Sequence, residues 1–309
     1  MNTEGQARGG HCQVDHADIV SLDTASGDRA ELMRTSYQRQ VFPRHSHDYF
    51  TLGVMLRGAG TLWHRGAEHI AYRGDVVVIP PGEIHTGGQT RGTTVLSYLA
   101  VHLSTKLFAA YASADESGGE RVPYLSAGII RDKIVAAQLR WLDVVMRGVQ
   151  GAAAIDGGIV DDALHAAIAQ LLRRHGETPL SSPSLARTRE PEFVRIVREV
   201  IADCYADNTQ TSLRALAVQV GVTTSHLVRV FTHSVGLSPH QYLLQMRVSR
   251  ATTLLAQGVQ LSFVAAMTGF VDQSHLTTQF KRFVGTTPAS YQRSVSARAG
   301  LHANPRSSR

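Results

Sequence analysis

The spacing of hydrophobic residues changes along the chain and divides it into segments of different character. Residues 1–30 are polar and rich in glycine, with no regular apolar spacing, which predicts a flexible N-terminal arm. From about residue 31 to residue 110, short apolar runs such as 51–56, 69–72, 75–79 and 95–103 alternate with glycine and proline. Short runs this close together are typical of the strands of a small barrel or sandwich.

The apolar spacing becomes helical after residue 110. Residues 129–149 and 159–174 carry apolar side chains three and four positions apart. In the first stretch the apolar residues at helical spacing are Ile130, Ile134, Ala137, Leu142 and Val145. The amphipathic helices of segment 111–175 suit a dimer interface, or they pack on the chain's own barrel. Residues 176–190 have a linker composition, 191–293 are helical, and 294–309 form a polar tail.

The helical C-terminal segment contains an internal repeat. Residues 225–242, SHLVRVFTHSVGLSPHQY, align with residues 274–291, SHLTTQFKRFVGTTPASY, at a constant offset of 49. Upstream the match continues at an offset of 48, so the second copy has one extra residue in its turn. The identical pairs within the aligned segments include Ser225/Ser274, His226/His275, Leu227/Leu276, Phe231/Phe280, Gly236/Gly285, Pro239/Pro288 and Tyr242/Tyr291.

Each copy has the parts of a helix-turn-helix. In the first copy, Ser212 and Thr223 are placed to cap two successive helices, and Gly221 permits the left-handed turn between them. In the second copy, Gly269 ends the first helix and Asp272 caps the next. We expect Leu213, Leu216, Ala217 and Val220 to face inward on the first helix. A further helix from Ser238 to Gln257 predicts a rigid spacer between the two units.

Composition and charge support an intracellular protein with a charged C-terminal segment. The 309 residues carry a net charge of +6, and residues 208–293, with seven basic residues and one acidic residue, account for all of it. This distribution favours a polyanionic partner, although a solvated basic surface explains it equally well. Cys12 and Cys204 have neither metal-ligand nor redox spacing, and no signal or membrane segment is evident. We therefore expect a reduced, cytoplasmic protein.

The repeat and its spacer resemble the AraC/XylS family of transcription regulators. The resemblance rests on GLSPHQYLLQMRVSRATTLL (236–255) and GFVDQSHLTTQFKRFVGTTPASYQR (269–293) and extends over about 100 residues. In that family two recognition helices enter successive major grooves, about 34 Å apart on one face of the duplex. The resemblance implies double-stranded DNA as a partner, RNA polymerase as a further partner, and no enzymatic activity.

The resemblance also implies which residues contact DNA. Arg229 is the candidate for a bidentate contact with guanine, and Gln273 for a contact with adenine. The full candidate set is Ser225, Val228, Arg229, Thr232, Gln273, Ser274, Thr277, Thr278 and Lys281. Arg247, Arg250, Lys281 and Arg282 are expected to hold phosphates or to brace the fold. Two positions depart from the family pattern: Val228 is apolar, and Val271 leaves the capping role to Asp272.

The N-terminal segment resembles the cupin-like sensory domain of the same family. Gly74, Pro80, Gly82 and His85 match the second cupin motif, and His45-x-His47 matches the start of the first. The resemblance implies an α+β multidomain chain: a cupin-like β-barrel, then helices, then an all-α domain with two helix-turn-helix units. For the small-molecule effector we select six residues: Tyr37, His47, Phe50, Trp63, His85 and Tyr98.

Metal binding is the main alternative for the N-terminal segment. His45, His47 and His85 could ligate a transition metal, which would make the chain a metal-dependent cupin enzyme with a DNA-binding appendage. The carboxylate that the motif expects four residues after His47 is absent, because Thr51 stands there. We therefore expect no metal or other cofactor, and histidines that line a polar pocket. A regulator with a vestigial barrel that binds no ligand is a third hypothesis.

Overall fold

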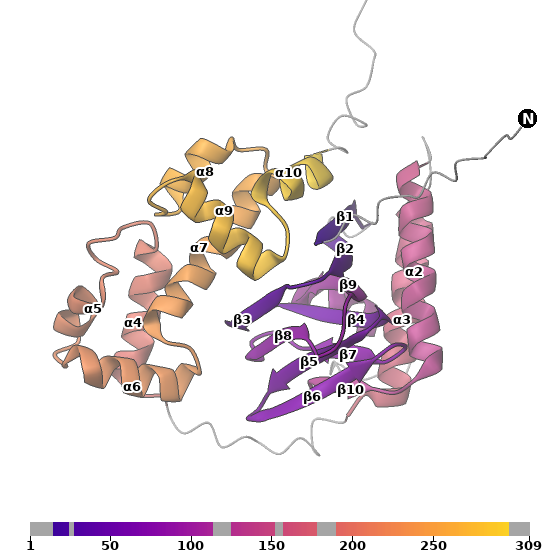
Figure 1. Ribbon diagram of the computed structural model, residues 1–309, viewed down its shortest axis with the longest axis horizontal. Helices are drawn as coiled ribbons and strands as arrows, with labels where there is room; N and C mark the ends of the chain where they lie inside the picture. The colour runs from indigo at the N-terminus through magenta and orange to yellow at the C-terminus, as the bar shows by residue number, and fades with distance from the viewer. Residues whose placement is uncertain (1–14, 25–27, 114–124, 152–156, 178–189, 297–309) are drawn as a thin grey trace, which may run out of the picture.

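The N-terminal half is built from two antiparallel sheets that face one another (Figure 1). The computed structural model describes residues 15–24, 28–113, 125–151, 157–177 and 190–296. The six-stranded sheet has the order β1 (His16–Asp23), β2 (Arg29–Tyr37), β9 (Leu96–Ser104), β4 (Tyr49–Arg57), β7 (Val76–Ile79), β10 (Gly128–Ile130). The four-stranded sheet has the order β3 (Val41–His45), β8 (His85–Gln89), β5 (Ala59–His64), β6 (Ala67–Tyr72).

Three helices cover the outer face of the six-stranded sheet: α1 (Thr105–Ser113), α2 (Lys133–Gly151) and α3 (Gly157–His175). Alternate strand residues such as Leu52, Val54 and Val101 point to these helices and form the main core with Phe108 and Leu139. The remaining strand residues point between the two sheets. The predicted barrel followed by helices is therefore confirmed.

The apolar residues that the spacing places on α2 fall on two sides of the helix. Leu142 and Val145 are buried against the sheet, but Ile134 is 47% exposed and Ala137 is exposed. The face that packs on the sheet is formed by Val135, Ala136, Leu139, Leu142, Val145 and Met146. The helix has two apolar stripes, and periodicity alone does not say which of them meets the sheet.

The segment predicted as a loose arm contains a strand. Residues 16–23 form β1, which pairs with β2 along its whole length, and Ile19 and Val20 are buried. The linker predicted at 176–190 lies almost entirely outside the described residues, as do the first 14 residues. At the other end, helix α10 continues to Ser296, into the predicted tail, and Val295 is buried.

The C-terminal part is all helical. Its elements are α4 (Glu192–Cys204), α5 (Leu213–Gln219), α6 (Thr224–Val235), α7 (Pro239–Ala256), α8 (Leu261–Met267), α9 (Gln273–Val284) and α10 (Pro288–Ser296). The first helix-turn-helix unit, α5 and α6, packs with α4 and α7 around Val197, Ile201, Leu216 and Phe231. Leu213, expected inward, is 40% exposed because it is the first residue of its short helix.

The second unit, α8 and α9, shares its core with the barrel. Leu276 and Phe280 of this unit lie in one apolar cluster with Ile19, Met33 and Tyr37 of the sheet. In Figure 1 the strands β1 and β3 accordingly lie beside α10 and α9. The barrel is thus docked on the spacer helix and the second unit.

Candidate nucleic-acid interface and ligand pocket

Side-chain caps begin the helices of both helix-turn-helix units where the sequence predicts them. The Ser212 hydroxyl accepts a hydrogen bond from the Ala215 amide at 3.2 Å. The Thr223 hydroxyl accepts one from the amide of His226 at 3.2 Å. These bonds satisfy amides that otherwise lack partners in the first turn, so α5 and α6 begin at fixed residues.

The second unit is capped in the same way by a carboxylate. Asp272 accepts a hydrogen bond from the His275 amide at 2.7 Å and takes the capping role that Val271 cannot. The spacer helix α7 has a full capping box between Ser238 and Gln241. The turn between α5 and α6 also follows the prediction, since Gly221 has φ +67°. Local sequence therefore fixes where both second helices start.

The first of these, α6, presents a polar outer face. Ser225 and Arg229 are exposed, and Arg229 contacts His226 Nδ1 at 3.2 Å. Val228 is half-buried, and the hydroxyl of Thr232 is buried with no partner among the described residues. Thr232 was expected to reach DNA, but its hydroxyl is not displayed on this outer face.

The equivalent helix α9 also presents polar residues. Gln273, Ser274, Thr278 and Lys281 are exposed, whereas Thr277 is half-buried. Thr278 donates its hydroxyl hydrogen to the Ser274 carbonyl at 2.9 Å, which leaves oxygen lone pairs for an outside donor. Leu276 and Phe280 are fully buried, so inner and outer faces divide as the repeat predicts.

Arg247 of α7 holds the two units in a fixed arrangement. It is 4% exposed, and its guanidinium donates to the Tyr205 carbonyl at 2.7 Å and to Asn208 Oδ1 at 3.0 Å. Asn208 in turn donates to the carbonyl of Gly269, in the turn of the second unit, at 3.2 Å. Of the two roles expected for Arg247, the structure supports bracing the fold.

Hydrogen bonds attach the barrel to the second unit and the spacer. Gln40 donates to the carbonyls of Lys281 and Arg282 at the end of α9, both at 3.3 Å. The Ser46 amide donates to Gln245 of α7 at 2.8 Å. These contacts lie at the two ends of one short segment, residues 40–46, which includes β3.

A further hydrogen bond joins the six-stranded sheet to the last helix, α10. The Tyr291 hydroxyl donates to Glu31 Oε1 at 2.8 Å. Burial raises the pKa of Glu31 above its ordinary value, and the hydrogen bond from Tyr291 only partly opposes this rise. The contact is therefore sensitive to the protonation of one carboxyl group.

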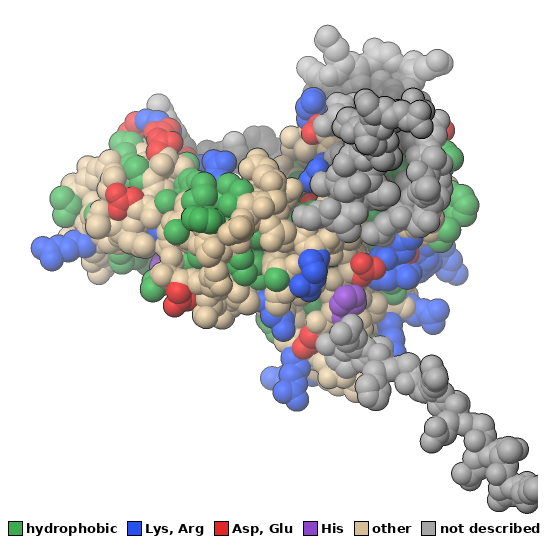
Figure 2. Space-filling view, turned by 90° about the horizontal axis from the view of Figure 1, so that it is seen from above, with side chains coloured by type: hydrophobic (Ala, Val, Ile, Leu, Met, Phe, Trp, Pro, Cys, Tyr) green, Lys and Arg blue, Asp and Glu red, His purple; other side chains and the backbone are tan. Residues whose placement is uncertain are grey.

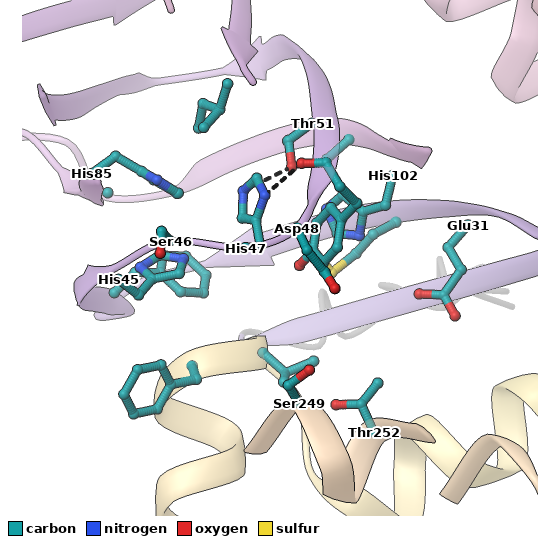
Figure 3. Close-up of a pocket in the computed structure, with 18 of the residues that line it drawn as sticks. Glu31, His45, Ser46, His47, Asp48, Thr51, His85, His102, Ser249 and Thr252 are labelled. Carbon is teal, nitrogen blue, oxygen red and sulfur yellow. Dashed lines mark hydrogen bonds between the residues drawn. The ribbon is translucent and has the colours of Figure 1, made fainter. Parts of the chain in front are cut away.

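A pocket of about 1420 Å³ lies between the two sheets and opens onto the C-terminal helices. Three of the six predicted effector residues line it: His47, His85 and Tyr98. Its other polar wall is formed by α7 and α10, with Gln245, Ser249, Thr252 and Tyr291 among the lining residues. Figure 3 shows Ser249 and Thr252 facing the histidines across the pocket.

The other three predicted effector residues do not line this pocket. Phe50 points to the opposite side of its strand and stacks on Phe108, with ring centroids 3.9 Å apart. Trp63 lies under Arg44, whose guanidinium carbon is 4.0 Å from the ring centroid. Tyr37 is fully buried beneath the end of α9. Aromatic character suggested these residues, but strand alternation and domain docking decide which side chains reach the pocket.

Four histidines from three strands and a loop gather in the pocket. The ring centroids of His45 and His85 are 4.2 Å apart, and those of His47 and His85 are 5.1 Å apart. His102 on β9 contacts Tyr49, with centroids 4.8 Å apart. Sequence reasoning missed His102 as a pocket residue, although it lies four residues after Tyr98 in β9, on the same face of the strand.

Burial keeps these imidazoles neutral. Burial, with a smaller contribution from the neighbouring imidazole of His45, lowers the pKa of His85 to about 3 and that of His102 to about 4. Burial likewise lowers the pKa values of His45 and His47. At neutral pH the centre of the pocket therefore carries no imidazolium charge.

Within the described ranges, no group of three or more His, Cys, Asp or Glu side chains is arranged to hold a metal ion. Nε2 of His47 lies 3.2 Å from the Thr51 hydroxyl, which occupies the position where the cupin motif would place a carboxylate ligand. His45, His47 and His85 line the pocket together.

A two-sheet barrel docked on a pair of helix-turn-helix units defines a ligand-binding, DNA-binding protein, and the family models agree. Residues 31–189 match the AraC-like ligand binding domain, and residues 216–294 match a helix-turn-helix domain. The chain belongs to the AraC family of transcriptional regulators. It combines the family's ligand-binding domain with its helix-turn-helix DNA-binding domain.

Individual relatives support this assignment. The chain is 31% identical over 238 residues to the uncharacterized HTH-type transcriptional regulator YbfI of Bacillus subtilis, covering 77% of this chain and 82% of that one. It is 25% identical over 267 residues to the transcriptional activator RhaR of Pectobacterium carotovorum, covering 83% and 88%. An apo ToxT variant from Vibrio cholerae has the same fold, with a TM-score of 0.52, 11% identity, and coverage of 90% and 97%.

Proposed function

We propose that this regulator reads duplex DNA with α6 and α9. The observation that carries the proposal is the pair of equivalent helices, each with a buried apolar side and an exposed polar side, held together by Arg247. The proposed contact residues are Ser225, Val228, Arg229, Gln273, Ser274, Thr277, Thr278 and Lys281. Arg229 has the exposure and the planar donor group that a guanine contact needs.

Binding to a duplex selected by the wild-type protein from random DNA tests this proposal. We expect affinity to fall steeply with salt concentration, because each phosphate contact releases counterions. Arg229→Ala should weaken binding by about 1–3 kcal/mol and relax the base preference at one position. Arg73→Ala, which removes an equally exposed charge from the barrel, is the matched control. Affinity that is independent of salt, or equal for both variants, contradicts the assignment.

We also propose that the pocket holds the small-molecule effector. Support comes from its position, because one bound molecule would touch both the barrel and the spacer helix α7. ToxT of Vibrio cholerae, which has the same fold with a TM-score of 0.51 and 10% identity, is known bound to (E)-4-(8-methylnaphthalen-1-yl)but-3-enoic acid. A ligand with different affinities for the docked and released arrangements would shift the population between them, and so alter DNA binding.

A homodimer formed through α2 completes the proposal. The outer stripe of this helix consists of residues spaced three and four apart: Ile134, Ala137, Trp141, Val144 and Gly148. Trp141 and Val144 are each 57% exposed, and this spacing is the one by which two identical helices pack along a common seam. We expect sedimentation to show a dimer that Trp141→Glu dissociates and that Arg140→Glu, exposed beside the stripe, leaves intact. If the wild-type protein is a monomer at micromolar concentration, the proposed dimer interface along α2 is refuted.

RNA polymerase is the proposed protein partner, and the cytoplasm the proposed location. The second unit exposes apolar side chains on α8 and just after it, namely Phe263, Met267 and Val271, and Figure 2, which looks down on this region, shows the apolar patch. Transcription in vitro from a bound promoter should drop in Phe263→Ser, but not in Ser262→Ala, at equal DNA occupancy. In the described part of the chain, no helix is long and apolar enough to cross a bilayer.

A further inference from the structure

Two histidines occupy the same position of the internal repeat, and they differ in their side-chain neighbours. His226 is the third residue of α6, and His275 is the third residue of α9. The amide of each donates a hydrogen bond to the side chain that caps its helix, Thr223 or Asp272, and each imidazole is half-buried. The backbone surroundings of the two rings are therefore alike.

Each imidazole also packs against an aromatic ring from outside its own helix. His226 lies against Phe193 of α4, the helix beside α6 in Figure 1, with ring centroids 5.8 Å apart. His275 lies against Phe270, in the turn between α8 and α9, with ring centroids 5.3 Å apart. Packing against a neighbour restricts the rotamers of a side chain, so both imidazoles are held in place before DNA is bound.

His226 accepts a hydrogen bond from the arginine that we propose as the guanine reader. Its Nδ1 lies 3.2 Å from Nη2 of Arg229, one turn further along α6. A guanidinium group only donates, so Nδ1 is the acceptor, and the hydrogen of the neutral ring is on Nε2. Within the described residues no ion pair holds Arg229, which is exposed. The imidazole therefore orients the guanidinium.

This hydrogen bond leaves Arg229 able to contact a base. It uses one of the five N–H groups of the guanidinium, and the remaining four still include an adjacent pair for O6 and N7 of guanine. Immobilising a flexible side chain at an interface reduces affinity about two- to tenfold. A guanidinium that is already oriented in the free protein avoids part of this loss.

The second copy of the repeat has no such pair. Thr278 stands where the first copy has Arg229, and its hydroxyl donates to the Ser274 carbonyl at 2.9 Å. No guanidinium therefore lies at the equivalent position beside His275. The two histidines share their place in the helix and their packing against an aromatic ring, but only His226 contacts an arginine that faces outward.

We propose that His226 is a positioning residue for base recognition, whose Nδ1 holds the guanidinium of Arg229 in the orientation that contacts guanine. The equivalent His275 has no such role. This inference rests on the proposed function, since it takes Arg229 as a residue that reads DNA. Base discrimination by the first helix-turn-helix unit then depends on an imidazole that need not touch the base.

Two substitutions of His226 separate positioning from packing. His226→Phe keeps an aromatic ring against Phe193 but loses the acceptor, whereas His226→Asn keeps an acceptor near the place of Nδ1 but loses the ring. Fluorescence anisotropy measures binding of the full-length protein to the duplex that the wild type selects, and to duplexes with each other base at the position where Arg229→Ala relaxes the preference. We expect His226→Phe to reduce the preference for guanine about two- to tenfold and His226→Asn to retain most of it.

The second copy provides the matched control. His275→Phe makes the same change at the equivalent position, and it should leave the preference at the Arg229 position unchanged. A double-mutant cycle completes the test, because His226→Phe should change this preference no further once Arg229→Ala is present. Thermal denaturation verifies the fold of each variant, and His226→Ala replaces His226→Phe if the latter does not fold.

The contrary outcomes separate this inference from the proposed function. If Arg229→Ala changes neither the affinity nor the base preference, Arg229 does not read DNA, and both are overturned. If Arg229→Ala relaxes the preference but His226→Phe does not, Arg229 reads DNA without His226, and only the positioning role is overturned. A preference that is lost in His226→Asn and kept in His226→Phe assigns His226 to packing, and this also overturns the positioning role alone.

Discussion

Replacing Arg247 by methionine isolates the brace that ties the two helix-turn-helix units together. Methionine keeps most of the length and volume of the side chain but removes its donors. The substitution leaves the Tyr205 carbonyl and Asn208 Oδ1 without the hydrogens that reach them at 2.7 and 3.0 Å. Asn208 then lacks the anchor that holds it against Gly269.

The expected cost follows from these contacts. A hydrogen bond from a charged donor contributes about 1.5–3 kcal/mol, and the burial cost of the guanidinium, which lowers the pKa of Arg247, is regained when the charge is removed. We expect the free energy of unfolding of the C-terminal domain to fall by about 2–4 kcal/mol. Binding to a duplex with two half-sites should fall further than binding to one half-site, because the spacing of α6 and α9 is no longer held.

Urea denaturation followed by far-ultraviolet circular dichroism measures the first effect. Both tryptophans, Trp63 and Trp141, lie in the N-terminal half, so their fluorescence follows that half separately and should change little. Arg250→Met, on the same helix but exposed, is the control and should cost less than about 1 kcal/mol. Equal stabilities of the Arg247 and Arg250 variants would refute the bracing role.

Three further predictions concern the capping residue, the docked interface and a buried carboxyl group. Asp272→Ala should lower the free energy of unfolding by about 1 kcal/mol in urea titrations, since it removes the cap of α9; unchanged stability would deny the cap. Gly285→Ala should cost more than Gly221→Ala in the same titrations, because both have positive φ but only at Gly285 would a Cβ meet a neighbour, 2.2 Å from the Tyr37 hydroxyl; equal costs would mean that the barrel is not docked there. Because the pKa of Glu31 is raised in the folded protein, folding becomes less favourable as pH rises from 4.5, its ordinary pKa, to the folded-state value. Glu31→Gln should therefore gain stability over the wild type across that pH window. A difference in the free energy of unfolding between the two proteins that stays constant from acid to neutral pH would contradict the raised pKa.

The features that local sequence determines were predicted well. The caps at Ser212, Thr223 and Asp272 depend on a side chain and an amide three residues apart, so a linear pattern contains all the information. The same holds for the turn at Gly221 and for the polar outer faces of α6 and α9. The AraC family and its two-part architecture followed from such local motifs.

The features that depend on distant parts of the chain were predicted poorly. Phe50 and Tyr49 are neighbours, and only the pairing of β4 decides that Tyr49 reaches the pocket and Phe50 the core. Ser249 and Thr252 were not considered for the pocket, because their place there depends on docking between segments 200 residues apart in sequence. Strand β1 was missed since its few apolar residues lie in a polar context.

The apolar cluster that joins Ile19, Met33 and Tyr37 to Leu276 and Phe280 has a practical consequence for dissecting the protein. Cutting the chain in the linker would divide this cluster, because its residues come from both sides of the cut. Each fragment would then expose apolar side chains that the other fragment covers in the whole protein, and the N-terminal fragment would expose the ring of Tyr37. Fragments made for separate study should stay in solution only after these positions are exchanged for polar residues.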